Sequence, residues 1–189
     1  MPQLYQIMNC SNVKFRFSFN KNEALTYALF AGCLSAANSP TKDIGPFFYH
    51  DLSKKESYTF EKFEKKQYLV KEASQTCKWE KSTKTKEIKG YTCKMATCTF
   101  AKGKAFGNFD LPMTKATVWY TDEIKTNASP LMYNDLGGAI LEMFVYFDDY
   151  SFTRISTDNI TLNKTEKADL ALAKSAEKIE QKAFLKKTK

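Results

Sequence analysis

Residues 140–147 read ILEMFVYF, and this stretch decides which fold the chain can adopt. Apolar side chains occupy nearly every position, and Glu142 is the only charged residue. A run this short and this apolar predicts a β-strand that is covered on both faces. Gly137 and Gly138 stand just before it. A glycine pair can adopt positive φ without a Cβ clash, so the pair predicts a tight turn or bulge that launches the strand.

Patterns typical of β-strands recur on the N-terminal side of this stretch. Near the C-terminus the spacing of apolar residues changes to that of a helix. Residues 13–19, VKFRFSF, alternate strictly between apolar and polar, which predicts a strand with one exposed face. Further extended stretches are predicted at 58–63, 68–71, 77–81, 90–100, 116–120, 152–156 and 160–162. After residue 163, Ala, Leu and Ile recur every three or four residues, which is typical of an amphipathic helix.

The charge balance narrows the classes of partner. The chain has 29 Lys and Arg against 21 Asp and Glu, a net charge of +8. Such a balance is compatible with nucleic acid, an anionic membrane surface or an acidic ligand. Arg16 and Arg154 are the only arginines, whereas proteins that read nucleic acid rely on arginine for bidentate and stacked contacts. The composition therefore argues against nucleic acid as the partner.

The cysteines do not form a metal motif. There are five of them, no C-x-x-C occurs, and His50 is the only histidine. A structural zinc site needs Cys and His pairs at short spacing, so no zinc site is expected. A glycine-rich phosphate loop is also missing, and we predict no cofactor. In an exported protein, Cys77 could pair with Cys93 or Cys98; free or buried thiols are the alternative.

The sequence contains no obvious membrane or targeting segment. No stretch offers the roughly twenty apolar residues of a membrane span, and the first residues lack the features of a standard signal peptide. Residues 28–33, ALFAGC, loosely resemble a lipoprotein cleavage site, which would make Cys33 a lipidation site. A core helix or strand is the interpretation we favour, because the apolar run is short.

Four ordered blocks between Trp79 and Glu142 resemble the signature region of the GLPGLI family. These are exported proteins of Bacteroidota-type bacteria. Trp79 comes first, and the blocks are TKEIKGYTCKMA at 85–96, VWYTDEI at 118–124, SP at 129–130 and DLGGAILE at 135–142. Three replacements in the last block and a methionine at position 95 identify a divergent member. The blocks contain Gly90, Pro130, Gly137 and Gly138, which we interpret as structural motif residues.

The resemblance and the strand pattern together predict the fold and the domain organisation. We expect a mostly β (α+β) protein, with a curved antiparallel sheet, bowl-like or half-barrel in form, and a C-terminal amphipathic helix. Residues 1–163 would form the β-rich domain that contains the signature at 79–142. Residues 164–189 would form a helix packed on the same domain. The resemblance also implies a periplasmic or outer-membrane-associated location, with peripheral or lipoprotein attachment as an option.

Large aromatic rings on neighbouring strands are the candidate ligand-binding residues. They could line a concave surface for a sugar or lipid, or they could be core and cross-strand pairs. Glu142 joins them because it lies inside an apolar strand and should be partly desolvated. The candidate set is Trp79, Tyr91, Trp119, Tyr120 and Glu142.

The function classes follow from what these residues can do. The leading hypothesis is a non-enzymatic envelope protein that binds a ligand or a protein partner, because no catalytic constellation is visible. The first alternative is a hydrolase acting on glycan with Glu123 and Glu142 as a carboxylate pair. The second alternative is a lysine-rich binder of anionic lipid or polysaccharide surfaces. We assign no catalytic residues and no metal ligands.

Overall fold

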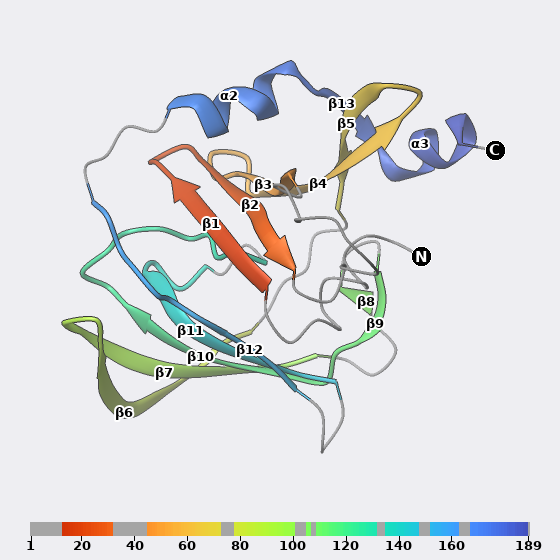
Figure 1. Ribbon diagram of the computed structural model, residues 1–189. Helices are drawn as coiled ribbons and strands as arrows, with labels where there is room; N and C mark the ends of the chain where they lie inside the picture. The colour runs from red at the N-terminus through yellow and green to blue at the C-terminus, as the bar shows by residue number, and fades with distance from the viewer. Residues whose placement is uncertain are drawn as a thin grey trace. The chain divides into compact units, whose positions relative to one another are not determined.

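The computed structural model describes residues 13–31, 45–72, 78–100, 105–106, 109–131, 135–147, 152–162 and 167–188 (Figure 1). The protein is mostly β, with short helices near the C-terminus, which confirms the predicted fold class. The contacts divide the chain into two compact units. Unit 1 comprises Met1–Ser74, Pro130–Tyr133 and Thr165–Lys189, and unit 2 comprises Gln75–Ser129 and Asn134–Lys164. The strands therefore form two main sheets, one in each unit.

The sheet of unit 1 has six strands in the order β1-β2-β3-β4-β5-β13. Neighbouring strands run antiparallel, except that β13 is parallel to β5. The strands are β1 (Val13–Phe19), β2 (Glu23–Ala31), β3 (Gly45–Asp51), β4 (Glu56–Phe63), β5 (Lys66–Lys71) and β13 (Glu177–Glu180). The strand predicted at residues 13–19 is confirmed as β1. Its exposed face is less distinct than predicted, because Arg16 and Ser18 are half-buried and Arg16 lies 5.0 Å from the Tyr27 ring.

A helix covers part of this sheet and completes its core. α2 (Lys167–Ser175) contacts β2 and β3. Ala173 of α2 packs with four buried side chains of the strands, and Leu170 and Phe60 pack against the cluster from its border. The four strand residues are Leu25, Tyr49, Tyr58 and Leu69. An alanine at the contact allows α2 to approach the strands closely.

The C-terminal segment corrects the prediction of one continuous helix. α2 ends at Ser175, β13 follows, and α3 (Gln181–Lys187) forms the next helical turns (Figure 1). Residues 177–180 pair with the edge of β5, which would otherwise present unpaired backbone groups. Ala183 is exposed, so the alanine stripe gains little burial beyond α2. Ile179 fits the helical spacing of apolar residues, but residues 177–180 form a strand that pairs with β5.

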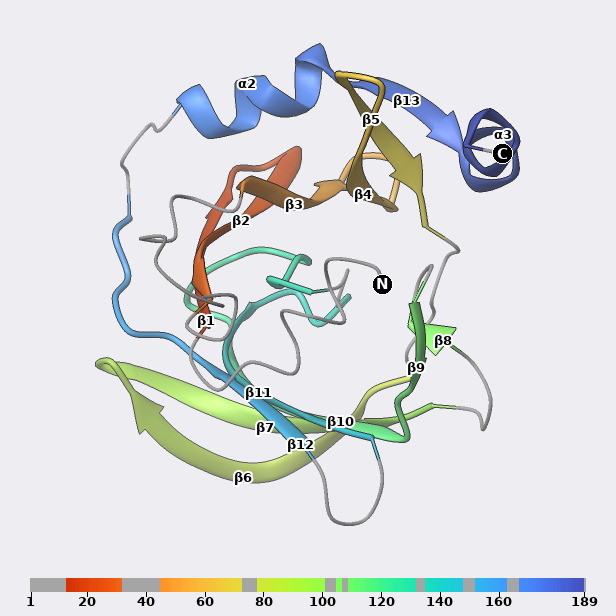
Figure 2. The ribbon, with the colours of Figure 1, turned by 45° about the vertical axis from the view of Figure 1, so that its right-hand side comes forward.

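The sheet of unit 2 has five strands in the order β12-β11-β10-β7-β6, all antiparallel. The strands are β6 (Glu80–Ile88), β7 (Tyr91–Thr99), β10 (Lys115–Thr121), β11 (Ala139–Tyr146) and β12 (Phe152–Ser156). Two short strands, β8 (Ala105–Phe106) and β9 (Phe109–Pro112), form a separate ribbon. Most of the apolar stretch at residues 140–147 belongs to β11, which lies between β10 and β12 as an inner strand should. Figure 2 shows the strands of this sheet bowed along their length.

Two turns of unit 2 depend on glycine. Lys89 and Gly90 connect β6 to β7, and both have positive φ, 55° and 81°. This is a two-residue type I′ turn, whose twist suits an antiparallel hairpin. At the start of β11, Gly137 has φ of 76°, whereas Gly138 is closely packed. A Cβ on Gly138 would lie 2.3 Å from the carbonyl oxygen of Thr121, while a Cβ on Gly137 would meet nothing within 4 Å.

Replacing each glycine of this pair by alanine should therefore give different losses of stability. Gly138→Ala should lower the free energy of unfolding by about 3 kcal/mol or more, because the clash is with backbone that cannot move aside. Gly137→Ala should cost only roughly 1–2 kcal/mol, the strain of a positive φ. Urea unfolding followed by circular dichroism measures both. Equal losses in the two variants would show that close packing at Gly138 does not constrain the fold.

Candidate binding face

One face of the unit 2 sheet is apolar and buried, and the other carries rings and charges. Cross-strand partners share a face, so the register identifies both sides. The buried face contains Ala96, Cys98, Ala116, Val118, Met143 and Val145, each at most 2% exposed. The other face, here called the aromatic–cation face, contains Lys86, Lys115, Trp119, Glu142, Phe144, Tyr146, Phe152 and Arg154.

A β-bulge places Glu142 on the aromatic–cation face. Tyr120 pairs with Ile140, but the next pair is Trp119 with Glu142, so Leu141 is an extra residue in β11. If regular pairing continued past Tyr120 and Ile140 without the bulge, Leu141 would pair with Trp119, and Glu142 would face Val118 on the buried apolar side. A shift of one residue moves a strand side chain to the opposite face. The bulge therefore brings the buried carboxylate beside Trp119.

Two cations hold the Glu142 carboxylate. Lys86 of β6 forms an ion pair with Oε2, and Arg154 of β12 places Nη2 2.6 Å and Nε 2.8 Å from Oε1. Glu142 is 5% exposed, whereas the side chains of Lys86 and Arg154 are 37% and 58% exposed. The acid thus lies beneath two cations that come from the two edge strands of the sheet.

Lys86 reaches Glu142 by crossing Trp119. Three strand spacings separate β6 from β11, which is about 14 Å in a flat sheet. Both side chains must extend toward each other to span that distance. The Lys86 ammonium passes 4.5 Å from the centre of the Trp119 ring, within the range of a cation–π interaction. Trp119 is half-buried under this contact.

Two further rings of the face, Phe144 and Tyr146, are also paired with cations. Arg154 lies 5.9 Å from the centre of the Phe144 ring, and Lys115 lies 5.7 Å from that of Tyr146. Phe152 contacts both rings, at 5.9 Å from Phe144 and 5.7 Å from Tyr146. Phe152 is 55% exposed, which is unusual for so large an apolar side chain. The face therefore consists of partly covered rings beneath exposed cations.

The surroundings of the Glu142 side chain favour its ionised form. Burial raises its pKa, but the hydrogen bonds from Lys86 and Arg154 and their positive charges outweigh burial and leave the pKa below its ordinary value. The carboxylate is ionised at neutral pH and both of its oxygens have donors. This environment supports a structural counter-ion and does not suit a general acid, which must carry a proton.

The structure separates the five predicted ligand-binding residues. Trp119 and Glu142 are direct cross-strand partners. Tyr120 follows Trp119 on the opposite face and is 4% exposed, as strand alternation requires. Tyr91 begins β7 beside the type I′ turn, and Trp79 is half-buried just before β6. The set is therefore not one cluster.

The most important partners of Glu142 were not among the sequence candidates. Lys86 and Arg154 come from strands distant in sequence from Glu142 or from each other. Arg154 was recognisable as one of two arginines, in the alternating stretch FTRIS at residues 152–156. The pairing that brings it diagonal to Glu142 depends on the register, which the sequence does not reveal.

Glu123, the other acid of the predicted carboxylate pair, and the motif residue Pro130 each have a structural contact away from this face. Glu123 is exposed in the turn after β10, where its Oε1 accepts the backbone N–H of Thr92 at 3.1 Å. Glu87 is exposed on β6. Pro130 belongs to unit 1, where its carbonyl accepts the Thr26 hydroxyl at 2.7 Å.

The described cysteines have different states. Cys98 is disulfide-bonded, and Cys93 is a free, buried thiol whose pKa is raised by burial. Cys93 is therefore not the cysteine that pairs with Cys98. Cys33 and Cys77 lie outside the described residues.

Among the described residues no group of three or more side chains could hold a metal ion, and no helix is long and apolar enough to cross a membrane.

Glu142→Gln should reveal the stability that this charge contributes. At pH 7 we expect the free energy of unfolding to fall by roughly 1–3 kcal/mol, since charged hydrogen bonds are lost. A depressed pKa stabilises the fold above the ordinary glutamate value of 4.5, and the contribution is lost as pH falls through the folded pKa. The difference between wild type and variant should therefore shrink in urea titrations from pH 7 to pH 3.5.

The exposed Glu87→Gln is the matched control. It should change stability by less than about 0.5 kcal/mol at any of these pH values. A gap between wild type and Glu142→Gln that is as large at pH 3.5 as at pH 7 would contradict an ionised Glu142.

Comparisons with known proteins add one structural likeness. No protein-family model and no curated protein matches the chain, so the GLPGLI resemblance stays a prediction. A solved structure of PNGF-II, in space group C2, aligns with a TM-score of 0.47 and 17% sequence identity. The alignment covers 93% of this chain and 31% of that one, so the chain spans about a third of the length of PNGF-II.

Proposed function

We propose that this protein is a non-enzymatic binding domain that takes an acidic polysaccharide on its aromatic–cation face. The observation that carries the proposal is the arrangement of Lys86 and Arg154 around Glu142. A single buried carboxylate holds two partly exposed cations, of which Lys86 lies over a tryptophan ring and Arg154 over a phenylalanine ring.

The two cations retain donors for a ligand. Lysine has three N–H donors and arginine has five. Glu142 accepts from the ammonium of Lys86 and from two nitrogens of Arg154. With side chains 37% and 58% exposed, both cations also face solvent. Because Glu142 holds them in place, an incoming carboxylate or sulfate meets positive charge that is already oriented.

The aromatic rings of the face would contact the sugar rings of the ligand, while the cations contact its acid groups. Aromatic side chains offer large apolar surfaces, and Phe152 is more than half exposed beside Phe144 and Tyr146. The apolar face of a sugar ring can pack on such a surface while its acid group contacts Arg154. A polymer of acidic sugars could occupy several ring–cation pairs along the sheet at once.

The same geometry gives little support to glycan hydrolysis. A glycosidase needs one carboxyl group with a raised pKa beside a second, ionised one. Glu142 has a lowered pKa and is covered by its partners. Glu123 is an exposed turn residue bound to a backbone N–H. The described carboxyl with a burial-raised pKa, Glu61, lies on β4 in unit 1.

The location remains part of the proposal. The resemblance to exported GLPGLI proteins supports a periplasmic or outer-membrane-associated protein, where a carbohydrate ligand of the envelope would be the partner. The net charge of +8 is compatible with an anionic partner.

Binding to polygalacturonate, measured by titration calorimetry, tests the function. Wild type should bind at 50 mM salt and lose binding at 1 M salt, where the Debye length is only about 3 Å. Arg154→Gln and Phe152→Ala should each weaken binding about tenfold, equivalent to about 1.4 kcal/mol. Lys125→Gln, which removes an exposed charge from the connection between β10 and β11, should bind like wild type.

Two further probes distinguish other outcomes. Neutral dextran should not bind, since it offers no partner for the cations. Vesicles containing phosphatidylglycerol test for a lipid surface. Binding to vesicles but not to polygalacturonate would replace the polysaccharide proposal with membrane attachment. Polygalacturonate binding that neither face variant weakens would show that the ligand lies elsewhere.

A further inference from the structure

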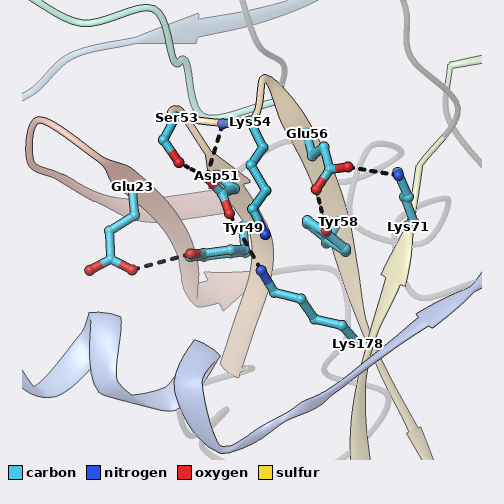
Figure 3. A network of polar contacts seen from close by, with 9 residues as sticks. All are labelled: Glu23, Tyr49, Asp51, Ser53, Lys54, Glu56, Tyr58, Lys71 and Lys178. Carbon is cyan, nitrogen blue, oxygen red and sulfur yellow. Dashed lines mark hydrogen bonds and ion pairs between the residues drawn. The ribbon is translucent and has the colours of Figure 1, made fainter.

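A second group of aromatic and charged side chains lies in unit 1 and has the form of a cation site (Figure 3). Tyr49 of β3 and Tyr58 of β4 are cross-strand partners, and their ring centres are 6.0 Å apart. Asp51 lies two residues after Tyr49, on the same face of β3. These three residues, here called the tyrosine cage, are each less than 9% exposed.

An ammonium group of the chain itself occupies the cage. Lys178 of β13 places its Nζ 5.3 Å from the ring centre of Tyr49, 4.8 Å from that of Tyr58 and 3.5 Å from Oδ2 of Asp51. Two aromatic faces and one carboxylate around an ammonium are the elements by which proteins recognise alkylated ammonium groups. Figure 3 shows Lys178 extending from β13 toward Asp51 beside both rings.

The walls of the cage are fixed by contacts that do not involve Lys178. The Tyr49 hydroxyl donates to Glu23 at 3.2 Å and the Tyr58 hydroxyl donates to Glu56 at 2.7 Å. Glu56 is in turn paired with Lys71 at 2.7 Å. Both rings also belong to the core cluster of unit 1. The two rings should therefore keep their positions when the lysine is removed.

Asp51 is anchored in the same way. It accepts the Ser53 hydroxyl at 2.6 Å and the Lys54 backbone N–H at 3.2 Å. Burial raises its pKa, but these hydrogen bonds and the charge of Lys178 leave the pKa below its ordinary value. The cage thus keeps a negative charge that needs a cation.

The element that delivers Lys178 is loosely bound by comparison. β13 has four residues, pairs with a single strand, and exposes Glu177, Lys178 and Glu180. The Lys178 side chain itself is 41% exposed. Only Ile179 of this strand is half-buried. A rigid, negatively charged cage is therefore filled from a short edge strand. Exposed ion pairs from Glu177 to Lys187 at 3.3 Å and from Glu180 to Lys71 at 3.7 Å add only weakly to the pairing of that strand with β5.

We propose that the tyrosine cage is a binding site for alkylammonium groups, which Lys178 fills as an intramolecular ligand. The ligand is either a small alkylammonium ion or a lysine in an extended peptide that replaces β13 along β5. The chemistry is the same in both cases, and only the second requires backbone pairing.

The test empties the cage and offers it new cations. Lys178→Ala is titrated with n-butylammonium and, separately, with the peptide acetyl-Glu-Lys-Ile-Glu-amide. We expect n-butylammonium to bind this variant at least tenfold more tightly than wild type, where Lys178 competes. Adding Asp51→Asn to Lys178→Ala should weaken that binding at least tenfold. Lys174→Ala, which removes an exposed lysine from α2, should behave like wild type.

The two ligands distinguish the source of the ammonium group. Binding of both means that the cage alone is sufficient. Binding of the peptide alone means that pairing with β5 is required, and the same peptide with norleucine in place of lysine should then fail. If a folded Lys178→Ala binds neither ligand, or binds them regardless of Asp51→Asn, the proposal is overturned.

A measurement on the wild-type protein covers the case in which Lys178→Ala does not fold. Reductive methylation with ¹³C-formaldehyde labels lysine amines without removing their charge. The dimethyl signal of Lys178 should be shifted upfield by the two tyrosine rings relative to that of Lys174. A Lys178 signal at the position of an exposed lysine would show that the cage does not hold an ammonium group.

Discussion

The close approach of Gly138 to Thr121 is the constraint on which the unit 2 sheet depends. It brings the start of β11 against the end of β10 with no room for a side chain, and it pairs Ala139 with Thr121. From that pair the register runs down the sheet, through one bulge, to the pair of Trp119 with Glu142. Because side chains alternate between faces, a displaced register would bury the charge of Glu142 among apolar residues. The composition of both faces follows from that contact.

Glu142 shows how a buried charge can be tolerated within an apolar strand. An isolated carboxylate in that position would be costly. Lys86 and Arg154 offset the cost, and each also packs over an aromatic ring. Their hydrocarbon stems cover apolar surface while their charged ends stay near water. The buried acid, the two cations and the rings thus form one structure, in which removing the acid would loosen the cations as well.

The sequence predicted individual strands and turns better than it predicted which strands pair and in which register. The apolar stretch of β11, the preceding glycine pair and the strand at 13–19 were evident because each pattern is local. The contact between Lys86 and Glu142 was not, since it needs four strands in a particular order and a bulge at Leu141. The C-terminal helix was predicted as continuous because alanine periodicity extends through residues 176–180. Pairing of those residues with β5 is a tertiary effect, and it overrides a weak helical preference.

The candidate site residues were likewise predictable where the sequence signal was local, and not where it depended on strand pairing. Trp119 and Glu142 could be singled out from the sequence, since a tryptophan and a lone acid in strands are conspicuous. Tyr120 could not be assigned to the opposite face until the register of β10 was known. The tyrosine cage had no sequence signal. Tyr49 and Tyr58 look like ordinary strand residues, Asp51 like a turn residue and Lys178 like a helix-surface lysine.

The parallel pairing of β13 with β5 has a consequence for the order in which the chain acquires its structure during synthesis. Unit 1 is assembled from segments that flank unit 2 along the chain, so its six-stranded sheet cannot be complete until residues 177–180 have left the ribosome. Unit 2 can form earlier, because all its segments precede β13. Until then β5 is an open edge, which can pair with other extended chains. A nascent protein would therefore pass through a stage in which β5 is accessible to a chaperone or to a neighbouring copy.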